Sequence, residues 1–302
     1  SDNFEVWMRL PPVQVNINES ASVTTNLFVG AKEVNTIKSY QKSLDIENFV
    51  DSVDWGWFFY LTKPIFFLLD WFNSFTHNMG WSIILLTLFI KTLLFPLSYK
   101  SFVSMSRMKH LQPQMEKIKK NAGDDRAKLQ QELMALYKKE KVNPVAGCLP
   151  ILLQIPVFFS LYKVLFVTIE MRHAPFIGWI KDLSAPDPTS YMNLFGLLPF
   201  SPPDPTSLFS IFSIGVYPIL MGVTMWLQQK LNPAPTDKTQ AMIFAWMPWV
   251  FMFMLGQFSA GLVIYWVANN LIQFGQQYII MYSQGVKPDI FGNILKSFKK
   301  SE

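Results

Sequence analysis

The chain has 302 residues, of which 50% are hydrophobic and 16% are charged, with a net charge of +5. Its apolar residues come in long runs, and this composition indicates a membrane protein. The single cysteine, Cys148, excludes an intrachain disulfide and makes a thiolate metal site implausible.

Residues 1–50 differ in kind from the rest. The segments 4–10, 13–17 and 22–29 are rich in β-branched and aromatic residues in partial alternation, which predicts short strands. Three short strands cannot enclose a core alone. We therefore expect residues 1–50 to be the C-terminal part of a larger extracytoplasmic β-rich domain whose beginning lies outside this sequence.

Residues 51–78 are dominated by aromatic side chains, interrupted by Pro64 and by the charges of Lys63 and Asp70. The length of Val53–Phe75 permits a membrane span. Aromatic crowding and dispersed charges instead favour an amphipathic helix lying on the outer leaflet. An additional span would also invert the charge bias described below, so we predict an interfacial helix.

Residues 79–302 contain apolar segments near the ~20 residues that a helix needs to cross the hydrocarbon core. The five predicted spans are Trp81–Leu97, Val145–Ile169, Ser210–Gln229, Thr239–Phe258 and Ala260–Tyr282. Each of the first four contains proline, for which simple kinking is the default expectation. The prediction is a mainly α membrane protein with a five-span helical bundle.

The distribution of charge predicts the orientation. Residues 98–143 hold eleven Lys/Arg against five Asp/Glu, whereas residues 171–209 hold only Arg172 and Lys181 as cations. The positive-inside rule places the first segment in the cytoplasm and the second outside. The first span then runs inward, and the basic tail 283–302 is cytoplasmic.

Residues 103–143 are expected to form a cytoplasmic helical hairpin, with helices at Met105–Asn121 and Asp124–Lys141. Apolar residues follow i+3/i+4 spacing in both, so the two stripes should pack on each other. Asp124 is the expected N-cap of the second helix. The basic, Met-bearing surface that remains suits docking to ribosomal RNA, acidic lipid or a targeting protein.

Lys91 lies deep in the first predicted span, where a cation costs at least ~2.5–3.5 kcal/mol on insertion scales. No carboxylate lies in the inner half of any predicted span, and few acceptors are evident. A cation without a counter-ion indicates a hydrated, positively charged cavity rather than a buried salt bridge.

Further polar side chains recur at helical spacing on the predicted spans, and we expect their faces to converge on Lys91, because amides and hydroxyls do not face lipid tails comfortably. These candidates are Thr87, Ser98, Gln154, Gln228, Tyr265, Asn269, Asn270 and Gln273. The alternative is that they hold helices together by interhelical hydrogen bonds of about 0.6 kcal/mol each. For any single Asn or Gln this alternative is favoured.

The remaining titratable residues indicate no catalytic centre. Lys163 is expected to extend to the outer interface near Glu170 and Arg172. The three histidines are scattered, and there is no phosphate-binding glycine loop, Ser/His pair or intramembrane carboxylate pair. We predict neither an enzyme nor a metal or cofactor site.

Several stretches together resemble the YidC/Oxa/Alb family of membrane protein insertases, in the form found in Gram-negative bacteria. They are Ile90–Leu97, Met115–Asp125, Met134–Pro144, Gly147–Pro156 and Ser259–Trp266. The resemblance covers roughly Asp54 to Lys300. Residues 1–50 resemble the end of the periplasmic β-sandwich domain of such proteins.

The resemblance implies a multi-pass protein of the bacterial inner membrane with a hydrophilic groove closed toward the outside. Lys91 stands where the family usually has arginine, which keeps the cation but loses the bidentate fork. Thr87 and Trp266 match positions that contact nascent spans, with Trp266 in place of a common tyrosine. Gln154 and Asn270 match groove-lining positions.

The partners that the resemblance implies are nascent membrane proteins, the ribosome, the Sec translocon, the signal recognition particle receptor and membrane lipids. An ion-coupled transporter is the alternative function. It predicts a second ionisable group near Lys91 and an internal repeat, and the sequence has neither.

Overall fold

The computed structural model describes residues 9–10, 12–123, 125–143, 149–200, 203, 207, 212–233 and 237–286, apart from the side chains of residues 126, 151 and 238. The chain divides into two compact units, Ser1–Ala31 and Lys32–Glu302. Each unit is described by itself.

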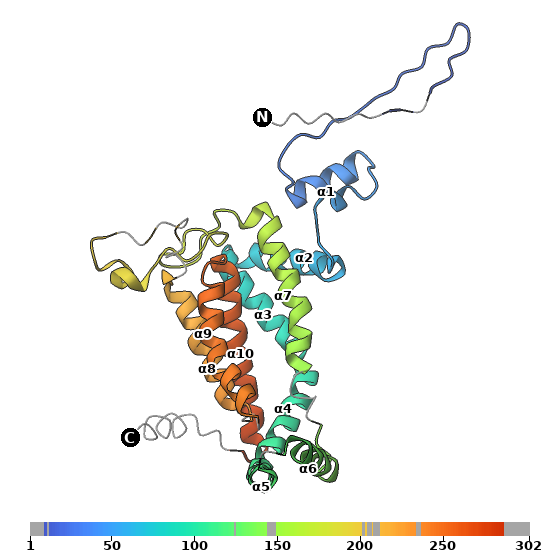
Figure 1. Cartoon of the computed structure of the whole chain (residues 1–302). Helices are drawn as coiled ribbons and strands as arrows, with labels where there is room; N and C mark the ends of the chain where they lie inside the picture. The colour runs from blue at the N-terminus through green and yellow to red at the C-terminus, as the bar shows by residue number, and fades with distance from the viewer. Residues whose placement is uncertain are drawn as a thin grey trace. The chain divides into compact units, whose positions relative to one another are not determined.

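The first unit contains no strand among its described residues, 9–10 and 12–31, so the strands predicted at 13–17 and 22–29 are wrong. Most of the segment predicted at 4–10 lies outside the described residues. Figure 1 shows an extended trace that turns back on itself, and the Glu19 amide donates to the Asn16 carbonyl at the turn, at 3.1 Å. Extended backbone becomes a strand only when its N–H and C=O groups pair with a neighbouring strand. The side chains suit a strand, but the described residues of this unit form no ladder of backbone hydrogen bonds.

The second unit begins with helix where a β-rich segment was expected. Helix α1 (Val34–Ser43) and the 3-10 helix η1 (Phe49–Ser52) precede α2 (Phe59–Thr76). Val34 and Ile37 are fully buried in the main core of this unit. The Val34 amide donates to Glu170 Oε1 at 3.2 Å, and burial raises the pKa of that carboxyl.

Helix α2 contains Pro64 and packs against α3 (Met79–Leu93) and α7 (Leu149–Val167). The side-chain oxygen of Asn78 accepts from the Trp81 amide at 3.2 Å and so caps the start of α3. The Asn78 side chain also donates to the Phe176 carbonyl at 3.1 Å, which joins this cap to the loop after α7.

The predicted span Trp81–Leu97 is a broken helix. Helix α3 ends at Leu93, α4 (Phe95–His110) begins two residues later, and their axes differ by 68°. Pro96 lacks an amide proton and disfavours the α conformation in the residue before it, so it sits in the first turn of a new helix. Together α3 and α4 have the length and hydropathy of a membrane span, whereas no single described helix passes that test.

The hairpin at residues 103–143 has different helix boundaries from those predicted. Helix α4 continues through Met105, the chain turns at Leu111, and α5 (Gln112–Ala122) and α6 (Arg126–Lys139) follow. Pro113 in the first turn of α5 suits a new helix start. Met105 does not join the hairpin stripe and packs instead with Phe102 and Ile280.

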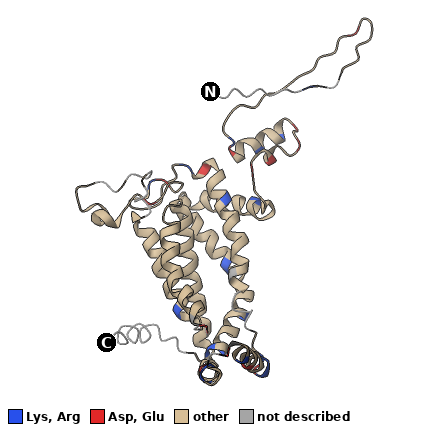
Figure 2. Cartoon of the chain, in the orientation of Figure 1, with Lys and Arg blue, Asp and Glu red and all other residues tan. Residues whose placement is uncertain are grey.

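The core of the hairpin is the predicted pair of stripes, formed by Leu111 and Met115 against Leu133 and Leu136. Asp125 caps α6, because its Oδ1 accepts from the Lys128 amide at 3.0 Å. The expected cap, Asp124, lies outside the described residues. The ribbon of α5 and α6 is coloured in Figure 2 at their Lys and Arg positions, which outnumber the acidic ones.

Replacing Asp125 with Ala should destabilise α6 by about 1 kcal/mol, because the Lys128 amide loses its acceptor. Hydrogen–deuterium exchange in the first turn of α6 should quicken about fivefold. Gln130→Ala, at an exposed position in the same helix, is the control and should not quicken exchange. Equal exchange in both variants would show that the Asp125 cap contributes nothing.

The other helices are α7, α8 (Val216–Leu231), α9 (Lys238–Leu255) and α10 (Ala260–Ser283), with the 3-10 helices η3 (Ile169–Met171) and η4 (Tyr191–Gly196) in the loop after α7. Helix α10 packs against α3, α4, α7 and α8 (Figure 1). It is therefore the element on which the side chains of several helices converge.

The loop after α7 accepts hydrogen bonds from the first turns of α8 and α10. The carbonyls of Leu183 and Ala185 accept from the amides of Gly261 and Ala260, at 2.9 and 2.7 Å. Asp187 Oδ2 accepts from the Tyr217 amide in the first turn of α8, at 2.9 Å. These bonds satisfy amides that a helix leaves unpaired at its start, and they fix α8 beside α10.

Candidate functional site

Lys91 is 7% exposed and lies where α3 meets α7 and α10. Its Nζ donates to Gln154 Oε1 of α7 at 3.2 Å and to Gln273 Oε1 of α10 at 2.8 Å. The Gln154 side chain donates in turn to the Tyr265 hydroxyl. We call Lys91, Gln154, Tyr265 and Gln273 the cation cluster. The expectation of few acceptors is wrong, because two amide oxygens from different helices converge on the ammonium.

The cation cluster holds a positive charge without a counter-ion. The ion pairs among the described residues are Lys63–Asp51, Lys163–Asp54 and His173–Asp182, so none includes Lys91. An ammonium group has three donors, and the two amides use two of them. One donor and most of the unit charge are available for a further acceptor.

A second polar set joins α8 to α10. Asn270 donates to Thr224 Oγ1 at 3.2 Å, Gln228 donates to Gln277, and Gln277 donates to Asn232 Oδ1 at 3.1 Å. We call these five residues the amide ladder. Its bonds run between helices, which is the interhelical interpretation that the sequence left open for Gln228 and Asn270.

Buried acceptors remain beside both polar sets. Gln228 Oε1, Asn269 Oδ1 and Gln276 Oε1 have no hydrogen-bond partner among the described residues. A buried amide oxygen without a donor costs about 1–3 kcal/mol. These oxygens can therefore accept from a donor that enters between the helices.

Three other predicted site residues, Thr87, Ser98 and Trp266, lie outside both the cation cluster and the amide ladder. Thr87 is buried, and its hydroxyl donates to the Ile83 carbonyl of its own helix at 2.7 Å. Ser98 is buried in α4, beyond the 68° bend, so it does not lie on the same straight helix as Thr87. Trp266 lies between Phe158 of α7 and Phe251 of α9, with ring centroids 4.9 and 6.0 Å away.

Two contacts were not predicted from the sequence. Asn232 joins the amide ladder although its position before Pro233 reads as a loop. Lys163 pairs with Asp54 Oδ2 at 2.6 Å, a partner that the sequence did not indicate. The hydrogen bond from Lys163 lowers the pKa of the Asp54 carboxyl. No group of three or more His, Cys, Asp or Glu side chains able to hold a metal ion occurs in the described part of the chain.

Comparison with known proteins places this arrangement in a family. Residues 71–287 match the family described as 60Kd inner membrane protein, and residues 1–68 match the YidC periplasmic domain. The chain is 66% identical over 300 residues to membrane protein insertase YidC of Roseobacter denitrificans and 64% identical over 302 residues to that of Dinoroseobacter shibae. These alignments cover 99% and 100% of this chain but 49% and 50% of the relatives, so the chain spans about half of their length.

A solved structure gives the same result for the fold. The crystal structure titled as an active YidC insertase with its first transmembrane domain resolved aligns with a TM-score of 0.57 at 25% identity. The alignment covers 82% of this chain and 54% of that one. The helical architecture and the periplasmic-domain segment expected from the sequence are thus confirmed. The chain belongs to the YidC family of membrane protein insertases, a family of multi-pass inner membrane proteins.

Proposed function

We propose that this chain inserts nascent membrane proteins into the lipid bilayer, and that the cation cluster receives their polar segments. The observation that carries the proposal is Lys91, a buried cation held by the Gln154 and Gln273 amides and by no carboxylate among the described residues. A cation is costly at this depth, and a structural tie between helices needs only neutral amides, as in the amide ladder. A positive charge at Lys91 is explained if it attracts an acidic or polar segment of the substrate.

Insertion in this form needs no covalent chemistry and no cofactor. The polar segment of the substrate exchanges its hydration for Lys91 and for acceptors such as Asn269 Oδ1. The apolar helix of the substrate then partitions into lipid, which supplies the driving force. The membrane potential assists acidic segments by about 2.3 kcal/mol per charge per 100 mV. Thr87 and Trp266 are proposed to guide the emerging helix.

The proposed topology keeps the five spans and their charge bias. The broken pair α3–α4 carries the first crossing inward, and α7, α8, α9 and α10 carry the others, with the C-terminus in the cytoplasm. Residues 1–50 form the end of the periplasmic domain, 51–78 the interfacial helix, and 79–302 the insertase core. Within that core, the basic hairpin 103–143 and the tail 283–302 face the cytoplasm.

The proposed partners follow from these surfaces. Nascent membrane proteins are the substrates, delivered by the ribosome alone or beside the Sec translocon. The exposed lysines of α5 and α6 complement ribosomal RNA, the signal recognition particle receptor or acidic lipid.

Site-specific photocrosslinking tests the path. Probes at Thr87 and Trp266 should each form adducts with a stalled, single-spanning nascent chain. A probe at Thr62 is the matched control, because Thr62 is also buried and also donates to the carbonyl four residues earlier, but lies in α2. It should form no adduct. Adducts at Thr62 alone, or at none of the three positions, would refute the proposed path.

A further inference from the structure

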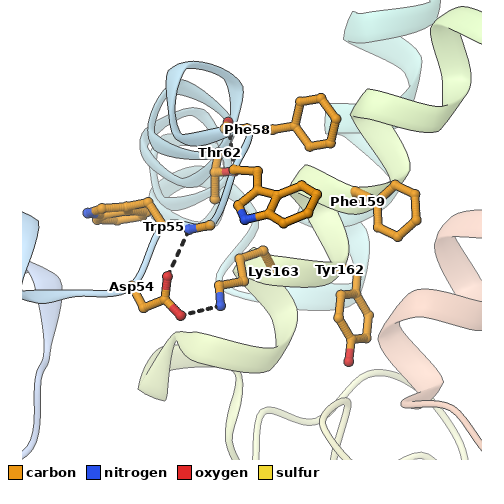
Figure 3. A pocket seen from close by; sticks show the side chains of 9 residues that line it. Asp54, Trp55, Phe58, Thr62, Phe159, Tyr162 and Lys163 are labelled. Atoms are coloured by element: carbon orange, nitrogen blue, oxygen red, sulfur yellow. Dashed lines mark hydrogen bonds and ion pairs between the residues drawn. The ribbon is translucent and has the colours of Figure 1, made fainter.

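A cleft of about 300 Å³ lies where the chain enters α2 and crosses α7. Residues 54–58 and Thr62 form one wall, and Phe159, Tyr162 and Lys163 form the other. Figure 3 shows the Lys163 ammonium pointing toward the Asp54 carboxylate, with aromatic rings lining the rest of the cleft. This cleft is separate from the cation cluster and shares no residue with it.

The polar end of the cleft presents one cation beside one anion. Lys163 Nζ and Asp54 Oδ2 are 2.6 Å apart, and the Asp54 side chain is 76% exposed. The other carboxylate oxygen of Asp54 accepts from the Gly56 amide at 3.0 Å. Gly56 has a φ of +72°, and a Cβ there would lie 3.3 Å from the Lys163 side chain. The sharp turn at this glycine therefore lets the lysine stem cross the backbone and reach Asp54.

Both charged groups retain hydrogen-bonding capacity. A lysine ammonium has three donors and a carboxylate accepts about four bonds, whereas the bonds above use one donor and two acceptor sites. A ligand with one negative and one positive group can therefore bind both without separating the pair. Its charges would alternate with those of Lys163 and Asp54, which is the favourable arrangement.

The apolar walls match a lipid rather than a small soluble zwitterion. Phe58 and Phe159 stack with centroids 6.4 Å apart, and Tyr162 stacks on Phe166 at 5.7 Å. Trp57 is 94% exposed, and Phe166 is 76% exposed. Exposed aromatic rings beside charged groups are typical of the membrane–water interface, where headgroup phosphates lie above the acyl chains.

We propose that this cleft binds the headgroup of a zwitterionic phospholipid that carries a primary ammonium. Lys163 binds the phosphate, Asp54 binds the ammonium, and Phe159, one helical turn nearer the bilayer centre, contacts the acyl chains. An anionic lipid without an ammonium would place its charge beside Asp54 and is disfavoured. The site also joins α2 to α7 through one lipid molecule.

Native mass spectrometry of the full 302-residue chain, released from nanodiscs of defined composition, measures the binding. In nanodiscs of equimolar phosphatidylethanolamine, phosphatidylglycerol and phosphatidylcholine, the chain should retain phosphatidylethanolamine preferentially. Lys163→Gln should lower that retention about tenfold, as expected for loss of one charge-assisted contact. Lys163→Arg keeps the positive charge and should retain phosphatidylethanolamine as the parent chain does. The matched control is Lys63→Gln, which breaks the Lys63–Asp51 pair outside the cleft and should leave retention unchanged.

Asp54→Asn separates lipid recognition from a merely structural role of the ion pair. It leaves the Lys163 cation without its anion, so the preference should shift from phosphatidylethanolamine toward phosphatidylglycerol. A purely structural pair would lower the retention of both lipids equally or of neither, and either result overturns the proposal. Equal retention in the parent chain of phosphatidylethanolamine, phosphatidylglycerol and phosphatidylcholine would also overturn it. The measurement does not involve insertion, so it stands or falls separately from the proposed function.

Discussion

Replacing Lys91 with Met is expected to reduce insertion of substrates with an acidic extracytoplasmic segment by at least about tenfold. Two unit charges 5 Å apart attract by about 3 kcal/mol at an effective dielectric constant of 20, which corresponds to more than a hundredfold. The side chain of Met has a similar length and no charge. Lys91→Arg keeps the cation and should retain most of the activity, although its planar group donates to the two amides with different geometry.

The Met variant should remain folded. Removing a desolvated cation relieves a penalty of several kcal/mol. The oxygens of Gln154 and Gln273 then lose their donor, at about 1–3 kcal/mol each. The two effects oppose each other and are of similar size, so the free energy of unfolding should shift by no more than about 2 kcal/mol. A folded chain that no longer inserts acidic substrates is the expected result.

The assay compares two substrates that differ only in the charge of the translocated segment, measured by protease protection in proteoliposomes. Lys63→Met, which removes a half-buried paired lysine outside the cation cluster, is the control and should insert both substrates normally. If Lys91→Met inserts the acidic substrate as well as the parent chain does, the cation has no role in substrate capture.

The burial of Lys91 within the protein could be predicted from sequence, because a cation inside an apolar segment is costly unless it faces polar groups. Its partners could not. Which of the many polar side chains on α7 and α10 reach the ammonium depends on the rotation of each helix, and on the 68° bend after Leu93. Gln154 and Gln273 were among the candidates, but so were Asn269 and Asn270, whose spacing fits equally well. The packing of the helices determines which of these side chains contacts Lys91.

The starts of α4 and α5 each carry a local signal, a proline in the first turn, but neither start was predicted. Pro96 marks the break between α3 and α4, although the sequence alone allowed a simple kink. The alternating pattern at 13–17 and 22–29 describes side chains that suit a strand, but a strand requires a second one, and the described residues supply none. The contact between Asp54 and Lys163 spans 109 residues, and no local pattern encodes it.

Gly80→Ala is expected to destabilise the chain by about 1–3 kcal/mol, although alanine is the better helix former by about 1 kcal/mol. A Cβ at Gly80 in α3 would lie 2.1 Å from Cδ2 of Phe176. The ring cannot withdraw easily. The Phe176 amide donates to the Ile180 carbonyl at 3.0 Å, its carbonyl accepts from Asn78, and its ring packs edge-on against Trp81. The absence of a side chain therefore allows the loop after α7 to lie against the start of α3.

A double-mutant cycle isolates this contact. Phe176→Ala alone should destabilise the chain by about 3 kcal/mol, because it leaves a cavity. Adding Gly80→Ala to that variant should then cost nothing or stabilise it, since the overlap is gone. Gly275→Ala in α10 is the matched control, because no described atom lies within 4 Å of its Cβ, and it should be neutral or stabilising by up to about 1 kcal/mol. The free energies come from SDS-induced unfolding in mixed micelles. If the cost of Gly80→Ala is the same with and without the Phe176 ring, the close approach of this loop to α3 is wrong.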